Sequence, residues 1–220
     1  MKQMIRIMLA CIAGSSAALA TPAALTVNVQ GIGSDGAIAE HYAACKATPD
    51  GKSAPGDNAR PEISWNAGPS GTKSYAVIVI DPDVPADFSE AGKEGHIVRG
   101  DAKRQPFFHW GLVDVPADVT KVAGGDSTVA PSTGKQVDED LKGYVSSTKN
   151  FGGPCPPWND ERVHHYHFMV LALDVDSLKL SDTATAKEAL AAAMAHAVAQ
   201  GEAVGSYTLN PLLRGGAPTK

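Results

Sequence analysis

Three runs of apolar residues, with many β-branched and aromatic side chains, constrain the fold more than any other feature of this chain. They cover residues 74–80 (SYAVIVI), 107–115 (FFHWGLVDV) and 166–175 (YHFMVLALDV). The first run is apolar at both odd and even positions, which is typical of a strand buried on both faces. The sequence therefore predicts a mostly β protein with these runs as its principal strands.

Shorter segments extend this pattern. Residues 25–29 predict an edge strand, residues 63–65 a short strand, and residues 204–209 a last strand. The connections are polar or rich in Gly, Pro, Ser and Thr, and they predict long loops at 46–61, 86–105 and 120–150. The DPDVP segment at 81–85 directly follows the first buried run and predicts a turn at its C-terminal end.

One helix is predicted, over residues 185–200. Thr185 and Glu188 have the spacing of a capping box, and Gly201 suits the position just after a helix C-terminus. The predicted apolar stripe consists of Leu190, Ala193, Met194 and Ala197. Several strands and a single late helix favour a mostly β (α+β) fold, with a β-sandwich-like core of antiparallel sheets and a C-terminal helix.

The first 20 residues have the pattern of a secretory signal peptide. Lys2 and Arg6 form a positive region, residues 7–13 are apolar, and small residues precede a cleavage point after Ala20. The apolar run is too short to span a bilayer. A lipoprotein signal at Cys11 is the alternative. We therefore expect a periplasmic or secreted protein.

The mature chain is expected to be acidic and to form one domain. Cleavage removes two of the 19 basic residues and no acidic residue, which leaves 17 basic against 24 acidic residues and changes the net charge from −5 to −7. Such a chain is a poor match for nucleic acid or anionic membrane surfaces. Residues 21–210 are long enough for one buried domain, and residues 211–220 predict a flexible tail.

Cleavage would also remove Cys11 and leave Cys45 and Cys155. An even number of cysteines in an exported protein favours a disulfide. A bridge that closes so long a loop stabilises a protein by roughly 4–5 kcal/mol in the chain-entropy model. Two free buried thiols are the alternative.

Polar side chains gather in three short segments beside the predicted strands. These segments are DPDVP at 81–85, FHW at 108–110 and GGPCPPWNDERVHHY at 152–166. Polar groups on rigid prolyl turns next to apolar strands indicate a small preformed pocket.

The histidines of these segments differ in what they predict. Strand side chains alternate, so His164 and Tyr166 share one face, and His165 and His167 share the other. A histidine such as His109, in mid-strand among aromatic residues, is by itself typical of a hydrogen-bonded core residue. The three segments considered together favour a binding site instead.

These motifs resemble those of the phosphatidylethanolamine-binding protein family, in its exported bacterial, Raf-kinase-inhibitor-like branch. DPDVP resembles the family's DPDxP motif, FHW its HW-hydrophobic strand, and GGPCPP with HHY its G-x-x-PP…H-x-Y motif. Residues 58–65 (NARPEISW) loosely resemble an upstream N-x-S-P-x-L-x-W element. The resemblance covers about residues 25–209.

The chain departs from the family pattern at three places. Ala59-Arg60 replaces the usual residues before the upstream proline, and His165 stands where many members have Arg. The segment 86–105 is longer than in short bacterial members, so the rim of the pocket is expected to differ.

The resemblance implies a pocket for phosphate, acetate or a phospholipid head group. Backbone donors near Gly153 and Cys155 would complete a wall made of Asp81, Pro85, His109, Pro157, His164 and Tyr166. Exported relatives also carry a cysteine pair, which supports a disulfide between Cys45 and Cys155.

A carboxylate in an anion site needs an explanation. We hypothesise that Asp81 orients His109 and favours its protonated form, so that His109 donates as an imidazolium. Tyr166 would donate its O–H, and His164 would be a second donor. Asp83, after a proline in a tight turn, is assigned a structural role instead of a ligand contact.

Two enzymatic alternatives fit parts of the sequence. His165 and His167, with a third ligand from His41, His96 or an aspartate, would suit zinc. However, a solvated or hydrogen-bonded outer strand face is the favoured explanation of the two histidines. Asp81 and His109 would suit a hydrolase, but no serine lies in a G-x-S-x-G elbow. The serines considered lie in polar loop sequence: Ser127, Ser132, Ser146 and Ser147.

A third alternative is an extracytoplasmic interaction or inhibitor protein. The segment 86–105 would be its contact surface, but Phe88, Ile97 and Val98 are its only large apolar residues. The sequence therefore favours a binding protein without turnover, and predicts no catalytic residue, no metal and no cofactor. The expected partner is a small anion or phospholipid head group, with no nucleic acid and no integral membrane contact.

Overall fold

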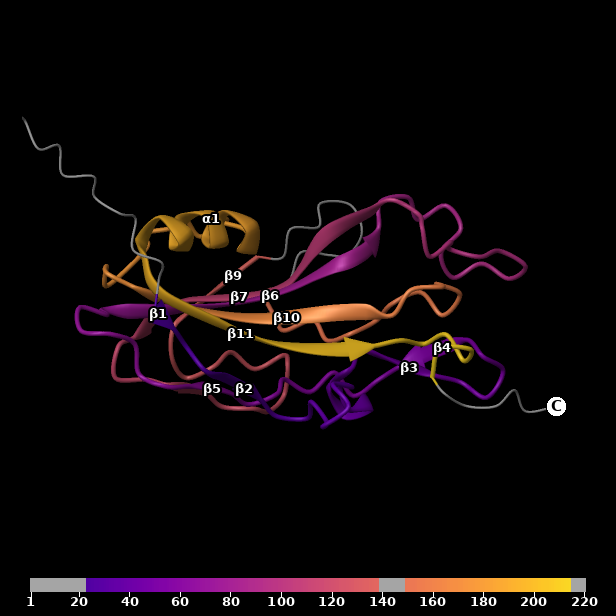
Figure 1. The fold of residues 1–220 in the computed structure, drawn as a ribbon, viewed down its shortest axis with the longest axis horizontal. Helices are drawn as coiled ribbons and strands as arrows, with labels where there is room; N and C mark the ends of the chain where they lie inside the picture. Colours follow the sequence, from indigo (N-terminus) through magenta and orange to yellow (C-terminus); the bar gives the residue numbers. More distant parts are fainter. Residues whose placement is uncertain (1–22, 139–148, 215–220) are drawn as a thin grey trace, which may run out of the picture.

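The computed structural model describes residues 23–138 and 149–214 (Figure 1). At its centre lies a six-stranded sheet in the order β1-β11-β10-β6-β7-β9. Its strands are β1 (Ala23–Ala24), β6 (Ser74–Pro85), β7 (Arg104–Pro116), β9 (Lys135–Val137), β10 (His164–Leu173) and β11 (Ala197–Tyr207). Neighbours are antiparallel except for the parallel pair of β1 and β11. The three predicted principal strands therefore lie side by side, as β10, β6 and β7.

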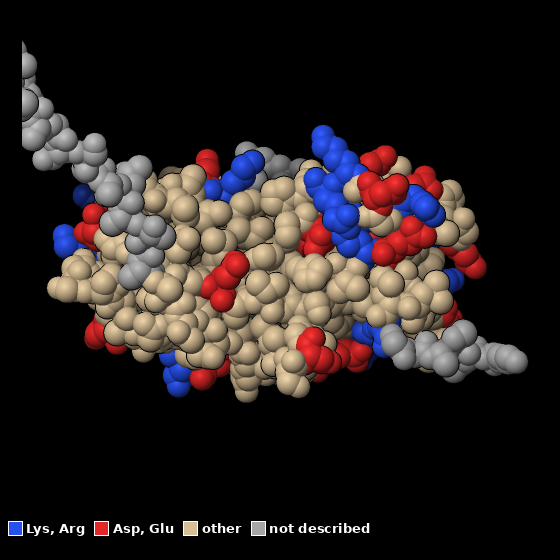
Figure 2. All heavy atoms as spheres, in the orientation of Figure 1, with Lys and Arg blue, Asp and Glu red and all other residues tan. Residues whose placement is uncertain are grey.

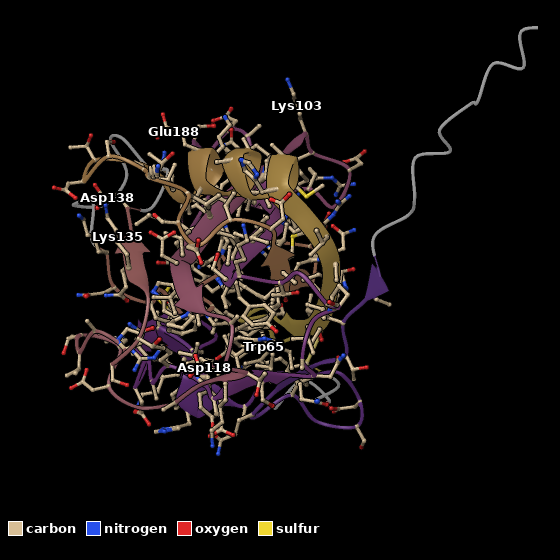
Figure 3. All side chains as sticks on the ribbon, turned by 90° about the vertical axis from the view of Figure 1, so that its left-hand side faces the viewer. Trp65, Lys103, Asp118, Lys135, Asp138 and Glu188 are labelled. Carbon is tan, nitrogen blue, oxygen red and sulfur yellow. A yellow bond between two sulfur atoms is a disulfide. The ribbon has the colours of Figure 1, made fainter. Side chains whose placement is uncertain are left out.

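Different layers cover the two faces of the central sheet. The helix α1 (Ala186–His196) lies on one face, and Trp65 lies on the other (Figure 3). Trp65 belongs to a three-stranded sheet of β2 (Val27–Val29), β5 (Ile63–Trp65) and β8 (Lys121–Val122). A short turn, η1 (Glu40–Tyr42), leads to the hairpin of β3 (Cys45–Ala47) and β4 (Ser53–Pro55). The predicted fold class, mostly antiparallel β with one helix, is confirmed.

Strand β6 is buried on both faces, as its sequence predicts. Val77 and Val79 pack into the core between the two sheets, whereas Ala76 and Ile78 pack into a second core beneath α1. All four side chains are at most 1% exposed. A strand with two apolar faces is expected only where layers cover the sheet on both sides.

The DPDVP segment is a continuation of β6, and the predicted turn at this place is wrong. The strand runs on to Pro85, and a bulge between Asp81 and Val84 interrupts its pairing with β7. Pro82 lacks an N–H for the ladder, and Asp81 Oδ1 accepts the N–H of Asp83 at 2.7 Å. This local hydrogen bond satisfies a backbone group that the bulge removes from the ladder.

The predicted helix begins as expected but ends too late. Thr185 caps it in a capping box with Glu188, whereas Ala197 already belongs to β11. Gly201 therefore lies inside a strand, where a Cβ would come within 2.0 Å of the Leu25 carbonyl oxygen. Of the predicted stripe, Ala193 is buried and Leu190 and Ala197 pack against the core, whereas Met194 is exposed. Ala186 and Ala189 complete the buried face.

Other boundaries differ in smaller ways. Of the predicted strand 25–29, only residues 27–29 form a strand, β2, and β1 lies just before this range in the other sheet. The predicted loop 120–150 contains β8 and β9. The expected signal peptide, Ser146, Ser147 and most of the expected tail lie outside the described residues. Within residues 23–138 and 149–214, no helix is long and apolar enough to cross a membrane.

Candidate functional site

A cavity of about 490 Å³ lies where β6, β7 and β10 meet the segment 150–157. It contains seven of the eight predicted ligand-binding residues: Asp81, His109, Gly153, Cys155, Pro157, His164 and Tyr166. Pro85 is not among the lining residues, whereas its neighbour Val84 is. The remaining lining is mainly apolar, with Phe88, Phe107, Phe151 and Pro156.

The alternation of β10 aims two of these side chains inward. His164 and Tyr166 are each 1% exposed. On the opposite face, His165 has an exposed side chain that pairs with Asp83, and His167 pairs with Glu202. The predicted division of the four residues between two faces is therefore present.

His164 lies between two carboxylates. Its Nδ1 is 2.6 Å from Asp81 Oδ2, and its Nε2 is 3.2 Å from Asp160 Oδ2. Carboxylate oxygens only accept, so both ring nitrogens donate and the imidazole is charged. Burial lowers the pKa of His164, but the two carboxylates outweigh burial and raise it to about 9.

Asp160 extends this buried network, and the sequence analysis did not identify it. Arg104 binds it with two hydrogen bonds, of 2.6 and 2.9 Å. Although burial opposes ionisation, the hydrogen bonds from His164 and Arg104 hold the pKa of Asp160 below its usual range. Asp160 lies four residues before His164 and outside β10, so the alternation rule for strands gave no signal for it.

Asp81 interacts chiefly with His164, and the hypothesis that it orients His109 does not match the geometry. Asp81 Oδ2 is 3.9 Å from His109 Nε2, too far for a hydrogen bond, against 2.6 Å to His164. Burial raises the pKa of Asp81, but the neighbouring His109 and His164 hold it well below its ordinary value. The carboxylate is therefore ionised, and the adjacent imidazolium compensates its charge.

His109 has one occupied and one open nitrogen. Its Nδ1 donates to the Gly152 carbonyl at 3.0 Å, while its own carbonyl accepts the Gly152 N–H at 3.1 Å. The buried Nε2 has no hydrogen-bond partner. Because Nδ1 carries a proton, Nε2 accepts when the ring is neutral and donates when the ring is charged.

Tyr166 presents the second open polar atom. Its buried Oη has no hydrogen-bond partner of good geometry, and its ring lies edge-on to His109 with centroids 5.1 Å apart. Burial, with the negative charge of Asp81, raises the pKa of Tyr166 well above its ordinary value. The hydroxyl therefore keeps its proton and remains a donor.

The segment 152–157 forms one wall of the cavity and is fixed at several points. Gly153 donates to Asn58 Oδ1 at 2.7 Å, and the Pro154 carbonyl accepts from Ala44 and Cys45. The predicted disulfide between Cys45 and Cys155 is present. Since Asn58 already takes the N–H of Gly153, this residue shapes the wall and offers the cavity no amide donor.

Asn58 is a further lining residue that the sequence analysis did not single out. Its side chain also donates to Ser127 Oγ at 3.1 Å and to the Phe151 carbonyl at 3.4 Å. It thereby connects three segments of the cavity wall. The signal for it in the sequence was its position at the start of the element at residues 58–65 (NARPEISW).

The residues considered for other roles form hydrogen bonds within the protein. Ser127 lies in a loop, as expected, and lines the cavity, where its Oγ accepts from Asn58. Asp83 does not line the cavity, and binds Arg162 and His165. No group of three potential metal-ligating side chains occurs within the described ranges 23–138 and 149–214.

Charged side chains of both signs gather outside the cavity, over the connection between β6 and β7 (Figure 2). They include the ion pairs of Arg99 with Glu161 and of Arg162 with Asp83. Because cations and anions are paired here, the site does not lie in a strongly basic surface. Any attraction for an anion would therefore come from donors inside the cavity.

The chain is similar in sequence to proteins of one known family. The chain matches the sequence model of the phosphatidylethanolamine-binding protein family over residues 30–208. The UPF0098 protein YbcL of Escherichia coli strain K12 is 34% identical over 134 residues, which cover 59% of this chain and 61% of that protein. The UPF0098 protein of Aquifex aeolicus is 30% identical over 190 residues, which cover 83% of this chain and 96% of that protein.

The fold agrees with a solved relative. The crystal structure of Escherichia coli YbcL superposes with a TM-score of 0.64 at 25% sequence identity. The superposition covers 84% of this chain and 99% of that chain.

Proposed function

The chain belongs to the phosphatidylethanolamine-binding protein family, and we propose that it binds a small anion in the cavity without chemical turnover. The anion is phosphate, a carboxylate or the phosphorylated head group of a phospholipid. One observation carries this proposal: His109 Nε2 and Tyr166 Oη are buried, unpartnered and part of the same apolar cavity. Buried polar groups are normally hydrogen-bonded, and ligand oxygens would supply the missing partners.

Each polar group has a distinct part in this binding. Tyr166 donates its O–H to one ligand oxygen, and protonated His109 donates Nε2–H to another. Asp81 accepts either the proton of a hydrogen phosphate or an ammonium proton of ethanolamine. His164 stays bonded to both carboxylates, so it compensates the charge of Asp81 and does not contact the ligand.

The same contacts favour binding over catalysis. A general base needs a free nitrogen hydrogen-bonded to a nucleophile. Both nitrogens of His164 donate to carboxylates, and the open Nε2 of His109 has no hydroxyl as a hydrogen-bond partner. The Ser127 hydroxyl accepts from Asn58 and has no histidine as a hydrogen-bond partner among the described contacts. We therefore assign a binding role to this cavity.

We extend the proposal to the cellular setting. The pattern of residues 1–20 supports export, so the ligand would be met in the periplasm or outside the cell. A phospholipid head group would enter singly, with its chains at the rim, because an acidic mature chain is repelled by anionic bilayers. An extracytoplasmic protein partner at the rim is the alternative.

Calorimetric titration with phosphate and phosphoethanolamine tests this function. We expect saturable binding to the wild-type protein. In Tyr166→Phe the affinity should fall by a factor of about ten or more, since a hydrogen bond to a charged group contributes about 1.5–3 kcal/mol. The matched control is His167→Ala, on the same strand but on the opposite face, which should bind like wild type. Absence of saturable binding to both ligands would contradict the proposal.

A further inference from the structure

The two sulfur atoms of the disulfide have different surroundings. Cys155 is exposed and lines the cavity. Cys45 is only partly exposed, packs against the core between the two sheets and is not a lining residue. A reagent that enters the cavity therefore meets Cys155 and not Cys45.

The wall that carries Cys155 does not depend on the disulfide alone. The Pro154 carbonyl accepts the N–H groups of Ala44 at 2.9 Å and of Cys45 at 3.2 Å. On the other side, the Pro157 carbonyl accepts the Asp160 N–H at 3.1 Å. These bonds hold both ends of the segment 154–157, so opening the S–S bond would leave Cys155 at the cavity.

We propose that Cys155 is a thiol-exchange site in the wall of the cavity, and that its co-reactant is a small thiol in its thiolate form. The thiolate attacks Cys155 Sγ, the bond between Cys155 and Cys45 breaks, and Cys45 leaves as a thiolate that takes a proton from solvent. One disulfide replaces another, so no external oxidant or reductant is needed. Access decides which sulfur is attacked, and access favours Cys155.

The exchange is coupled to occupancy of the cavity. A group bonded to Cys155 takes up space that the anion would use, and a bound anion shields Cys155 from attack. By thermodynamic linkage, each disfavours the other by the same factor. This coupling rests on the proposed anion binding, whereas the preference for Cys155 over Cys45 does not.

The first test uses the full wild-type chain and 2-mercaptoethanol. After brief exposure, free thiols are trapped with N-ethylmaleimide and the cysteine peptides are identified by mass spectrometry, which separates Cys11 from the other two. We expect one main product, with mercaptoethanol on Cys155 and maleimide on Cys45. It should exceed the product with the opposite modifications about tenfold or more. An equal mixture, or the reverse pattern, would overturn the proposal.

Two matched variants measure the same asymmetry directly. Cys45→Ser leaves the thiol of Cys155, and Cys155→Ser leaves the thiol of Cys45. Iodoacetamide should label the first thiol at least about ten times faster in the folded proteins, and at similar rates in urea, where access is equal. Equal rates in the folded proteins would overturn the proposal, and the wild-type test decides if a variant does not fold.

Added phosphate separates this inference from the proposed function. Phosphate should slow the labelling of Cys155 in Cys45→Ser and leave the labelling of Cys45 in Cys155→Ser unchanged. Preference for Cys155 without phosphate protection would support the exchange site and contradict anion binding in this cavity. Saturable phosphate binding by calorimetry without that preference would contradict the exchange site alone.

Discussion

His164 explains at the scale of a single residue how a carboxylate fits into an anion site. Its imidazolium donates to Asp81 and Asp160, so the inner carboxylates are compensated before any ligand arrives. A ligand of the proposed class would then meet His109 Nε2 and Tyr166 Oη, which have no hydrogen-bond partner. The histidine that pairs with Asp81 is therefore His164 and not His109, which was the expected partner.

The raised pKa of His164 predicts how stability depends on pH. Its folded-state pKa is about 9 against an ordinary value of 6.5, so its contribution is fully present below pH 6.5 and is lost as the pH rises through about 9. This contribution is on the order of 3 kcal/mol. Urea denaturation between pH 6.5 and 9.5 should show the free energy of unfolding falling across this window.

The matched variant for this prediction is Asp160→Asn. It removes one of the two carboxylates that raise the pKa of His164. The free energy of unfolding should therefore fall less steeply between pH 6.5 and 9.5, even if the variant is less stable than wild type at pH 6.5. An identical slope in wild type and variant would show that another group causes the decline.

The two nitrogens of His109 predict how ligand binding depends on pH. Nε2 becomes a donor only when the ring is protonated, because Nδ1 already holds the proton that it donates to the Gly152 carbonyl. Phosphate should therefore bind more tightly at pH 5.5 than at pH 8 in calorimetric titrations. His109→Ala should weaken binding more than His165→Ala does. Flat affinity over this range would contradict a role for the imidazolium.

Among the structural elements, the wall 152–157 depends most on a close backbone approach. A Cβ on Gly153 would lie 2.1 Å from the Tyr42 carbonyl oxygen and 2.8 Å from Asn58 Oδ1. Only glycine allows the wall to approach η1 and Asn58 this closely, and this approach brings Cys155 and Pro157 to the cavity.

Gly153→Ala should therefore displace the wall. We expect a loss of about 1–3 kcal/mol in the free energy of unfolding, the usual cost of overpacking, together with weaker phosphate binding. The matched control is Gly100→Ala, where the nearest atoms would lie at 3.6 Å, an ordinary contact. Thermal denaturation and calorimetry measure both effects, and equal behaviour of the two variants would contradict this view of the wall.

The element boundaries show where local signals failed. Residues 191–199 are rich in alanine and favour a helix by propensity, yet Ala197 begins β11. Strand β11 pairs with β10 over almost the whole length of β11, and these hydrogen bonds outweigh the helix propensity of the alanines. By contrast, the capping box at Thr185 is a local interaction, and its spacing predicted the helix start correctly.

On the scale of the whole molecule, the disulfide joins parts of the chain 110 residues apart. Closing a loop of that length restricts the unfolded chain and stabilises the folded protein by roughly 4–5 kcal/mol in the chain-entropy model. The double variant Cys45→Ser/Cys155→Ser should lose stability of this order in urea denaturation. Reduced wild-type protein should behave like the variant, and an unchanged midpoint in both would contradict the prediction.

The sequence by itself determined the principal strands, the start of the helix, the cysteine pair and the inward face of β10, because these depend on residue type and on short, regular spacings. Only the tertiary structure decided that His164 and not His109 binds Asp81, that Asp160 and Asn58 complete the site, and that Pro85 does not line the cavity. Such contacts join residues from separate elements, and many of them are far apart in the chain. Their geometry follows from strand register, a bulge and the packing of layers, which no local pattern specifies.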